Sequence, residues 1–229
     1  MTFGGIYREV YVQVRNKTHL ADVFIKPQIH PLQVTTEITV QNISDGITLQ
    51  QEIRKKGEGA YSPLGQKPVK QTNVQTVFPV QEIRLWEPEN PYLYEIRTSL
   101  WKNGEMIDAR VDITGFREAG FRKDGFYLNG KKLRLRGLNR HQSYPYVGYA
   151  APASMQIFDA DILKKELGVN AVRTSHYPQS QDFIRRCDEI GLLVFTEFPG
   201  WQHIGGEEWK RQAMQNLKEM IVQYRNHPS

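Results

Sequence analysis

The sequence predicts a multidomain β plus α/β protein, in which a β-sandwich of immunoglobulin type precedes the first three βα units of a (β/α)8 barrel. Residues 7–117 have the pattern of short alternating strands separated by turn residues, with no helical period between them. Residues 118–229 instead alternate apolar strands with amphipathic helices. Since 229 residues suffice for two domains of ordinary size, the two patterns predict two domains.

Seven segments of the first domain have the composition and alternation of strands. They are Tyr7–Val14, Ala21–Ile29, Gln33–Gln41, Ile47–Ile53, Val74–Leu85, Tyr94–Trp101 and Met106–Phe116. Turn residues such as Ser44-Asp45-Gly46 lie between them, as expected of antiparallel strands. Lys55–Lys70 is rich in glycine, proline and lysine and is predicted to be a long exposed loop.

The second domain is predicted to begin with a hairpin and then to alternate strands with helices. The expected elements are a hairpin at Phe126–Lys132, strands at Leu133–Leu138, Val169–Val172 and Leu192–Phe195, and helices near Ser154–Leu167, after Ser180 and at Glu207–Arg225. Ser180 is a candidate N-cap, and Gly191 is a C-terminal stop. Apolar residues recur on one face of the first helix (Met155, Phe158, Ile162, Leu163 and Leu167) and of the last (Trp209, Ala213, Leu217, Met220, Ile221 and Tyr224). Both helices are therefore expected to bury one side.

Composition and charge exclude several classes of function. The net charge is +5, but the densest basic segment, Lys131–Arg136, alternates leucine with basic residues as a strand does. Nucleic-acid binding is therefore not predicted. No segment has the length of a membrane span or the pattern of a signal peptide, so a soluble cytoplasmic or periplasmic protein is expected. The single cysteine, Cys187, excludes an internal disulfide and is interpreted as part of an apolar helix face.

Polar residues follow each of the three predicted strands of the second domain. They are Asn139 and His141 after the first strand, Arg173 and His176 after the second, and Glu197 and Trp201 after the third. In a parallel barrel the loops that leave the carboxyl ends of the strands build the active site. We therefore predict that these loops form a functional site.

The segment 170–195 also carries a longer pattern that resembles the signature of glycoside hydrolase family 2. The pattern consists of Asn170, Arg173, His176-Tyr177-Pro178, Asp188, Gly191 and the apolar residues 192–195. Further segments similar to that family are Arg136–His141, Leu85–Tyr94 and Gly4–Arg8, so that the resemblance covers nearly the whole chain. It implies an immunoglobulin-like sandwich at 7–117 and the N-terminal part of a TIM barrel at 118–229. Residues 1–6 would end a preceding sugar-binding jelly-roll domain.

This resemblance implies a retaining glycosidase that cleaves terminal β-linked sugars, with β-galactosides as the expected substrates. A retaining glycosidase needs two carboxylates about 5–5.5 Å apart. The resemblance places both catalytic glutamates beyond Ser229, so this chain alone is expected to be inactive. Arg173 is expected to orient the nucleophile, and Glu197 to support Arg173 or His141. The expected sugar-binding residues are His141, His176, Asn139 and Trp201.

Each of these roles has an alternative. Arg173 can form a structural ion pair, and His176 a structural hydrogen bond. Asn139 can orient its loop together with Arg140, and Trp201 can cover the barrel rim. The whole chain can also be a non-catalytic carbohydrate-binding or assembly fragment, and the full-length protein can form a homo-oligomer.

No metal or other cofactor is predicted. Some β-galactosidases of the family bind magnesium through a glutamate and a histidine in the loop of Glu197, but Pro199 stands where that histidine is expected. His141, His176 and His203 lie on three separate loops without the short spacing of zinc ligands.

Overall fold

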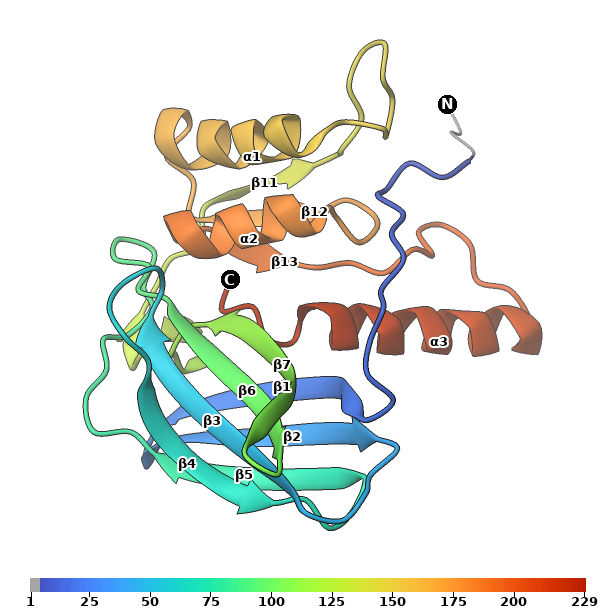
Figure 1. Ribbon diagram of the computed structural model, residues 1–229. Coiled ribbons are helices and arrows are strands. Elements are labelled where there is room, and N and C mark those ends of the chain that lie inside the picture. The colour runs from blue at the N-terminus through green and yellow to red at the C-terminus, as the bar shows by residue number, and fades with distance from the viewer. Residues whose placement is uncertain (1–4) are drawn as a thin grey trace.

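The computed structural model describes residues 5–229 and divides them into a β-sandwich and an α/β part (Figure 1). Residues 1–4, which include most of the segment predicted to end a preceding domain, lie outside the described residues. The sandwich occupies one side of the molecule, and the helices lie on the other side. No helix among residues 5–229 combines the length and the hydropathy that a membrane crossing requires.

Two antiparallel sheets form the sandwich. The first has the order β1-β2-β5 and contains β1 (His19–Ile29), β2 (Leu32–Gln41) and β5 (Asn73–Pro79). The second has the order β4-β3-β6-β7 and contains β4 (Ser62–Pro68), β3 (Ile47–Lys55), β6 (Tyr94–Lys102) and β7 (Glu105–Thr114). Alternate residues of both sheets point inward to one core, among them Val23, Ile38, Leu49 and Ile96. The sandwich fold class predicted from the alternation is therefore observed.

Two predictions for this region are wrong. Tyr7–Val14 is not a strand, because it makes no ladder with another segment, and all its residues except Arg8 are exposed. The predicted loop Lys55–Lys70 contains β4, which pairs with β3. Pro63 and Pro68 favoured the prediction of a loop, because proline cannot donate a backbone hydrogen bond to a ladder. However, β4 is an edge strand with a ladder on one side only, where proline is tolerated.

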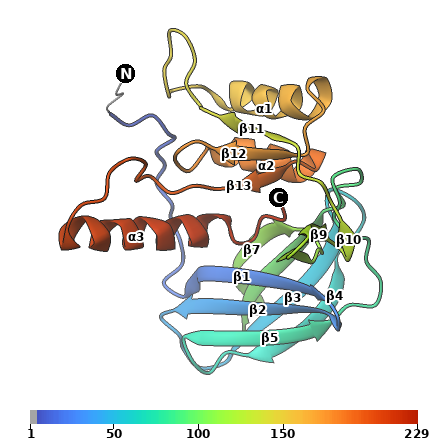
Figure 2. The same cartoon turned by 180° about the vertical axis from the view of Figure 1, so that it is seen from behind.

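The α/β part begins with a small antiparallel sheet in the order β10-β9-β8. Its strands are β8 (Ala119–Arg122), β9 (Gly125–Leu128) and β10 (Lys131–Lys132). A parallel sheet follows in the order β11-β12-β13, with β11 (Gly137–Arg140), β12 (Ala171–Thr174) and β13 (Leu193–Phe195). Helices α1 (Ala153–Asp161) and α2 (Gln181–Ile190) lie side by side on one face of this sheet, as Figures 1 and 2 show.

The first parallel strand begins four residues later than predicted. Asn170 explains the difference, because its side chain pairs with the backbone that precedes β11. Its Oδ1 accepts from the Arg136 amide at 2.7 Å, and its Nδ2 donates to the Arg134 carbonyl at 2.9 Å. The side-chain amide of Asn170 thus makes the hydrogen bonds that a neighbouring strand would otherwise make with this backbone. The ladder between β11 and β12 starts only at Gly137.

Helix α2 begins and ends as predicted. The Ser180 hydroxyl accepts a hydrogen bond from the Asp182 amide at 3.3 Å, and Gly191 ends the helix with a φ of 70°. A side chain at Gly191 would collide with the Pro88 carbonyl, 2.3 Å from the position of a Cβ atom. Cys187 is fully buried in the apolar face of the helix, as expected.

The predicted apolar faces of the other two helices are wrong in part. A π-helical turn at Ile162–Glu166 continues α1 and changes its phase, so that Phe158 and Leu167 are exposed and Leu163 is buried. Helix α3 (Glu207–Tyr224) has no buried residue, although its apolar pattern predicts a buried side. The apolar side chains of α3 make too few contacts within residues 5–229 to become buried.

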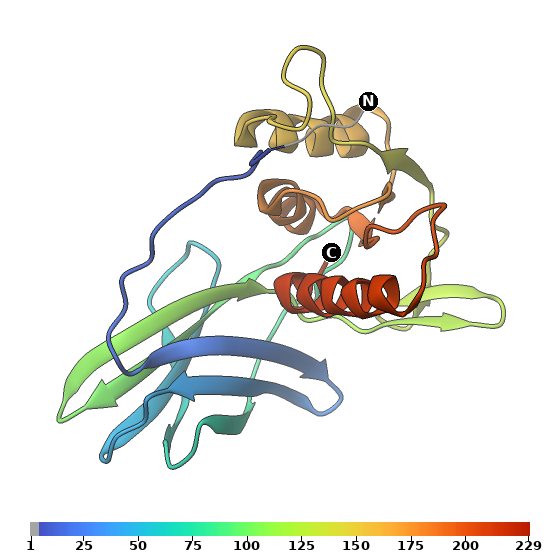
Figure 3. The same ribbon diagram turned by 90° about the vertical axis from the view of Figure 1, so that its right-hand side faces the viewer.

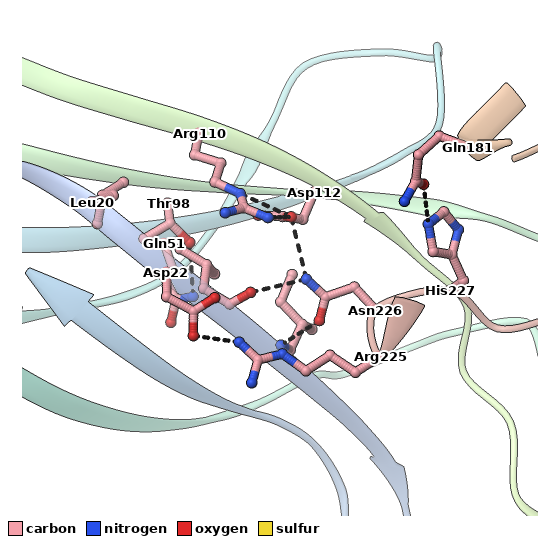
Figure 4. A network of polar contacts seen from close by, with 12 residues as sticks. Leu20, Asp22, Gln51, Thr98, Arg110, Asp112, Gln181, Arg225, Asn226 and His227 are labelled. Atoms are coloured by element: carbon pink, nitrogen blue, oxygen red, sulfur yellow. Dashed lines mark hydrogen bonds and ion pairs between the residues drawn. The ribbon is translucent and has the colours of Figure 1, made fainter. Parts of the chain in front are cut away.

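The segment after α3 joins the α/β part to the sandwich (Figure 4). The Asn226 side chain accepts from the Ile25 amide at 3.0 Å and donates to the Val23 carbonyl at 2.9 Å, and so covers the free edge of β1. Arg225 forms an ion pair with Asp22, and His227 contacts Asp188 at 2.5 Å and Gln181 at 3.1 Å. A second contact between the two parts is the Trp86 indole, which donates to the Asp188 carbonyl at 2.8 Å.

Candidate functional site

The carboxyl ends of β11, β12 and β13 bring the predicted site residues together. The parallel register places Asn139 beside Arg173, and Arg173 beside Phe195. His141, His176 and Glu197 follow within three residues of these positions. The loops at this edge, residues 141–152, 175–180 and 196–206, contain one carboxylate, that of Glu197.

Glu197 forms the centre of a polar cluster. Its Oε1 accepts from Arg173 Nη2 at 3.0 Å and lies 3.2 Å from His176 Nδ1, while Arg173 Nη2 lies 3.3 Å from the same ring nitrogen. The side chain of Arg173 is 45% exposed and that of Glu197 is 26% exposed. The ion pair is therefore partly solvated, and the guanidinium retains open surface for a further anionic or hydroxyl partner.

Glu197 has an unsatisfied acceptor despite this pairing. Its Oε2 is buried and lies 3.0 Å from Arg173 Nη2, but no hydrogen bond reaches it within residues 5–229. We attribute the difference to angle, because a single N–H cannot point at both carboxylate oxygens. Glu197 is consequently held from one side and keeps the capacity to accept one more hydrogen bond.

Thr174 fixes the backbone of Glu197 and was not predicted as a site residue. Its hydroxyl accepts from the Glu197 amide at 3.0 Å and donates to the Phe195 carbonyl at 3.3 Å. Thr174 is fully buried, so it links β12 to the end of β13 away from water. A hydroxyl contact across two strands leaves no local pattern in a sequence, so the sequence did not indicate a site role for Thr174.

The aromatic rings of the site surround His176. The Trp201 ring lies parallel to the His176 ring, with 4.4 Å between the centroids and 1° between the planes. The His141 ring meets the His176 ring edge-on at 5.5 Å. Trp201 is 59% exposed, so it does not bury its surface against the barrel rim. The stacking leaves part of the indole surface accessible next to two imidazoles.

Asn139 and Arg140 have different environments. Arg140 is buried and donates to Asp159 and Gln156, each at 2.8 Å, while its guanidinium lies over the Phe183 ring at 4.1 Å. Arg140 therefore holds β11 against α1 and α2. Asn139 is exposed on the strand beside Arg173, and within residues 5–229 its side chain makes no hydrogen bond that would orient the loop.

Tyr177 and Tyr149 extend the site beyond the residues predicted from the sequence. Their rings lie 5.4 Å apart, and the Tyr177 ring lies 6.3 Å from that of His141. Burial raises the pKa of Tyr177 to about 12, and a hydrogen bond with Tyr149 adds to this shift. Tyr177 thus stays neutral at physiological pH. The His-Tyr-Pro motif contained it, but the motif alone did not indicate which partner its hydroxyl has.

The described residues offer no cluster of metal ligands. Across residues 5–229, no three side chains of histidine, cysteine, aspartate or glutamate come close enough to share a metal ion. Glu197, the carboxylate in these loops, is engaged by a guanidinium. The cluster can instead bind hydroxyl groups, since carboxylate, imidazole and guanidinium together supply donors and acceptors.

Two family models match this chain. One is described as glycosyl hydrolases family 2 and matches residues 18–117; the other is described as glycosyl hydrolases family 2, TIM barrel domain, and matches residues 120–229. The β-sandwich followed by a parallel sheet with helices is consistent with the start of a TIM barrel.

Similar proteins are longer than this chain. A β-galactosidase of Thermoanaerobacter pseudethanolicus is 48% identical, and the match covers 100% of this chain and 32% of the relative. A β-galactosidase of Thermoanaerobacterium thermosulfurigenes is 46% identical, with coverage of 100% and 33%. The solved structure of Bacteroides uniformis β-glucuronidase 2, covalently bound to cyclophellitol-6-carboxylate aziridine, matches with a TM-score of 0.87 and 29% identity, covering 98% of this chain and 29% of that one. The chain thus spans about a third of the length of these curated relatives.

Proposed function

The chain belongs to glycosyl hydrolases family 2, and from this premise we propose that it forms part of a retaining β-glycosidase that removes terminal β-galactosyl groups. The observation that carries the proposal is the cluster of Arg173, Glu197, His176 and Trp201 at the carboxyl ends of parallel strands. We propose that these strands and helices are the first three βα units of an eight-stranded barrel.

Each residue of the cluster has a proposed role. Arg173 orients the nucleophilic carboxylate and keeps it ionised, because its guanidinium is fixed by Glu197 and still exposed. His141 and His176 bind sugar hydroxyls, since a neutral imidazole both donates and accepts. The proposed further sugar contacts are Asn139 and the accessible surface of Trp201.

Catalysis requires groups from outside the loops described above. A retaining glycosidase uses one carboxylate as nucleophile and a second as acid and base. The three loops supply Glu197 alone, and its contacts with Arg173 and His176 support a positioning role. We therefore propose that both catalytic glutamates belong to the part of the enzyme that follows Ser229. The nucleophilic glutamate then bonds to the anomeric carbon while the glycosidic bond breaks and the second glutamate protonates the leaving oxygen; water, deprotonated by the second glutamate, next cleaves the glycosyl-enzyme bond and releases the sugar.

The substrate proposal rests on the relatives. The two bacterial relatives at 48% and 46% identity are named β-galactosidases. The covalent complex named for the β-glucuronidase supports a covalent intermediate in a related site. Galactosides and glucuronides differ at C4, where the hydroxyl group is axial in galactose and equatorial in glucuronic acid, and at C6, where galactose has a hydroxymethyl group and glucuronic acid a carboxylate. The two are therefore separated by the groups that face these two carbons.

Hydrolysis of an aryl β-galactoside by the complete protein tests this proposal. We expect the first product to be the β-anomer of galactose, observed by proton NMR before mutarotation. Arg173→Met should lower kcat/KM about 100-fold, because the nucleophile loses its fixed partner. Arg185→Met is the matched control, since this arginine is exposed on α2 and, within residues 5–229, forms an ion pair only with Asp182. Release of the α-anomer, or hydrolysis of glucuronides but not galactosides, would contradict the proposal.

A second candidate is sugar binding without hydrolysis by this chain alone. The single carboxylate of the three loops favours it, because the hydroxyl-binding groups are present without a catalytic pair. Titration of the purified chain with galactose tests this candidate. Saturable binding that His176→Ala abolishes, without hydrolysis of an aryl galactoside, is the expected result. Hydrolysis by the chain that Glu197→Gln abolishes would contradict it.

A further inference from the structure

One contact outside the described cluster connects the two histidine loops to a distant segment. Gln142 directly follows His141 and is completely buried. Its side-chain oxygen accepts a hydrogen bond from Arg8, and its backbone amide donates to the Tyr177 hydroxyl at 3.3 Å. Tyr177 in turn directly follows His176. A single buried residue therefore links the loop of His141 to the loop of His176.

Arg8 holds both ends of the loop that begins at Gln142. Besides Gln142, its guanidinium donates to the Tyr149 carbonyl at 3.3 Å. Between these two residues the chain turns back on itself, with a bridge between Tyr144 and Gly148. Tyr146 at the tip is fully exposed. The loop is therefore fixed at its base by one side chain that comes from more than 130 residues earlier in the sequence.

His141 depends on this loop for its orientation. Within residues 5–229 its ring makes no hydrogen bond, and it contacts only the rings of His176 and Tyr177. His176, by contrast, is held by Glu197 and Trp201. The position of the His141 ring relative to the His176 ring is thus set by the backbone of the loop, which the contact between Arg8 and Gln142 fixes.

The chemistry of Arg8 supports a positioning role. Burial lowers the pKa of Arg8, and no carboxylate within residues 5–229 forms an ion pair with it. Its guanidinium instead donates to two neutral oxygens, from Nη1 to the Tyr149 carbonyl and from Nη2 to the Gln142 side chain. The segment that contains Arg8 then runs, without a ladder partner, past the helices to β1 of the sandwich (Figure 3).

We propose that Arg8, acting through Gln142, positions the His141 ring against the His176 ring and so sets the spacing of the two sugar-binding imidazoles. The role as sugar ligands rests on the proposed function; the positioning of the rings does not. Arg8 contacts no residue of the Arg173 cluster directly, so it is a positioning residue. The segment before the sandwich thereby controls a site in the α/β part.

NMR spectra of the histidine rings in this chain test the proposal without a substrate. We expect Arg8→Met to shift and broaden the ring nitrogen signals of His141 while the Trp86 indole signal, at the joint of the two parts, stays unchanged. Arg15→Met is the matched control, because Arg15 follows on the same segment and, within residues 5–229, its side chain hydrogen-bonds only to the Leu20 carbonyl and the Gln13 side chain. Unchanged His141 signals in Arg8→Met, with Tyr149 and Gln142 unperturbed, would overturn the proposal.

Two further variants separate positioning from loss of folding. Gln142→Glu keeps the acceptor and adds a negative charge opposite Arg8, so it should retain the wild-type His141 signals. Gln142→Leu should reproduce the His141 signals of Arg8→Met, and the double variant should add little at His141, because both changes remove the contact between Arg8 and Gln142. Additive effects would overturn the pathway through Gln142.

Galactose titration adds a readout for function. If the wild-type chain binds galactose, Arg8→Met should weaken the affinity roughly tenfold, as expected for losing the alignment of one hydrogen-bonding group. Arg15→Met should leave the affinity unchanged. Equal affinity in Arg8→Met and wild type would contradict the proposed link to sugar binding. Absence of galactose binding in the wild-type chain would contradict sugar binding by this chain alone, and the ring spectra would still decide the positioning.

Discussion

The sandwich and the α/β part differ in how completely their apolar surfaces are buried. In the sandwich, both sheets enclose one core in which Leu49, Ile96 and Leu100 are fully buried. In the α/β part, α3 has 18 residues and no buried side chain, and Ile221 is 53% exposed. The difference teaches that a helical period identifies an apolar face, while burial of that face depends on a partner from another element.

The two parts also place their buried polar groups differently. In the sandwich, Gln51 is fully buried and its amide donates to Thr36 and Thr98, each at 3.1 Å, while its oxygen accepts from Thr76 at 2.6 Å. The α/β part buries a charged residue, Arg140, at 4% exposure, more deeply than the sandwich buries Asp112, at 8% exposure. Four predictions test these two comparisons, from the largest expected effect to the smallest.

Arg140→Met should have the largest effect. It removes the cation that pairs with Asp159 and leaves Gln156 and Gln179 without their donor. Loss of one partner of a buried ion pair costs about 3–5 kcal/mol of unfolding free energy. Urea unfolding of the chain measures it. Arg134→Met, at an exposed arginine, serves as control, and an equal loss of stability in both variants would contradict the structural role of Arg140.

Gln51→Leu should destabilise the sandwich by about 1–3 kcal/mol, because the hydroxyl groups around it lose their partner in a dry core. The control is Gln50→Leu at the preceding residue of β3, where the side chain is only partly buried. Both substitutions replace a glutamine with leucine and therefore remove the same kind of side-chain amide. If the two variants unfold at the same urea concentration, the buried network makes no specific contribution.

The pKa values of Asp112 in the sandwich and Asp161 in the α/β part should be shifted in opposite directions, so that their contributions to stability depend on pH with opposite sign. Burial raises the pKa of Asp112 in spite of Arg110. Burial also acts on Asp161, but hydrogen bonds from Lys165 and Arg186 outweigh it and lower the pKa. The carboxyl signals of both residues can be followed by carbon NMR during an acid titration. A higher midpoint for Asp161 than for Asp112 would contradict this assignment.

The sign of each contribution to stability follows from these shifts. A raised pKa in the folded state means that the charged form of Asp112 disfavours folding, so stability is gained as the pH falls through the folded pKa. A lowered pKa means that Asp161 stabilises the fold above the unfolded pKa, and that this contribution is lost as the pH falls through the folded pKa. Asp112→Asn and Asp161→Asn should remove these opposite dependences.

Ile221→Ala should have the smallest effect, within about 0.5 kcal/mol, because the side chain is already exposed. Ile96→Ala in the sandwich core is the matched positive control and should cost about 2–5 kcal/mol. Urea unfolding compares the two. A loss of more than 2 kcal/mol for Ile221→Ala would mean that the chain buries α3 in solution, for example against a second copy.

Local patterns predicted the fold class and the three loops of the site. Alternation indicated the sandwich, and Ser180 and Gly191 marked the ends of α2 because capping is a local interaction. The positions of Arg173, His176 and Glu197 after consecutive parallel strands predicted that they would meet, and they do so in the structure. Their catalytic roles stay predictions, because geometry alone does not test them.

The features that sequence reasoning missed depend on contacts between distant segments. Asn170 delays the start of β11 by pairing with residues more than 30 positions earlier, and Arg8 reaches Gln142 across the α/β part. The proline-containing β4 forms because β3 offers it an edge. The unpaired segment 7–14 has the alternation of a strand but no partner among residues 5–229. None of these outcomes is encoded in a window of neighbouring residues.

The contact of Asn226 with the edge of β1 also sets an order of events during synthesis. Asn226 is made 203 residues after Val23, whose carbonyl it binds. At a translation rate of about 5–20 residues per second, the edge of β1 stays uncovered on the ribosome for roughly 10–40 seconds. A nascent sandwich of this kind exposes a strand edge that can pair with a neighbouring chain. On crowded polysomes, the uncovered β1 edges of neighbouring nascent chains therefore come close to one another.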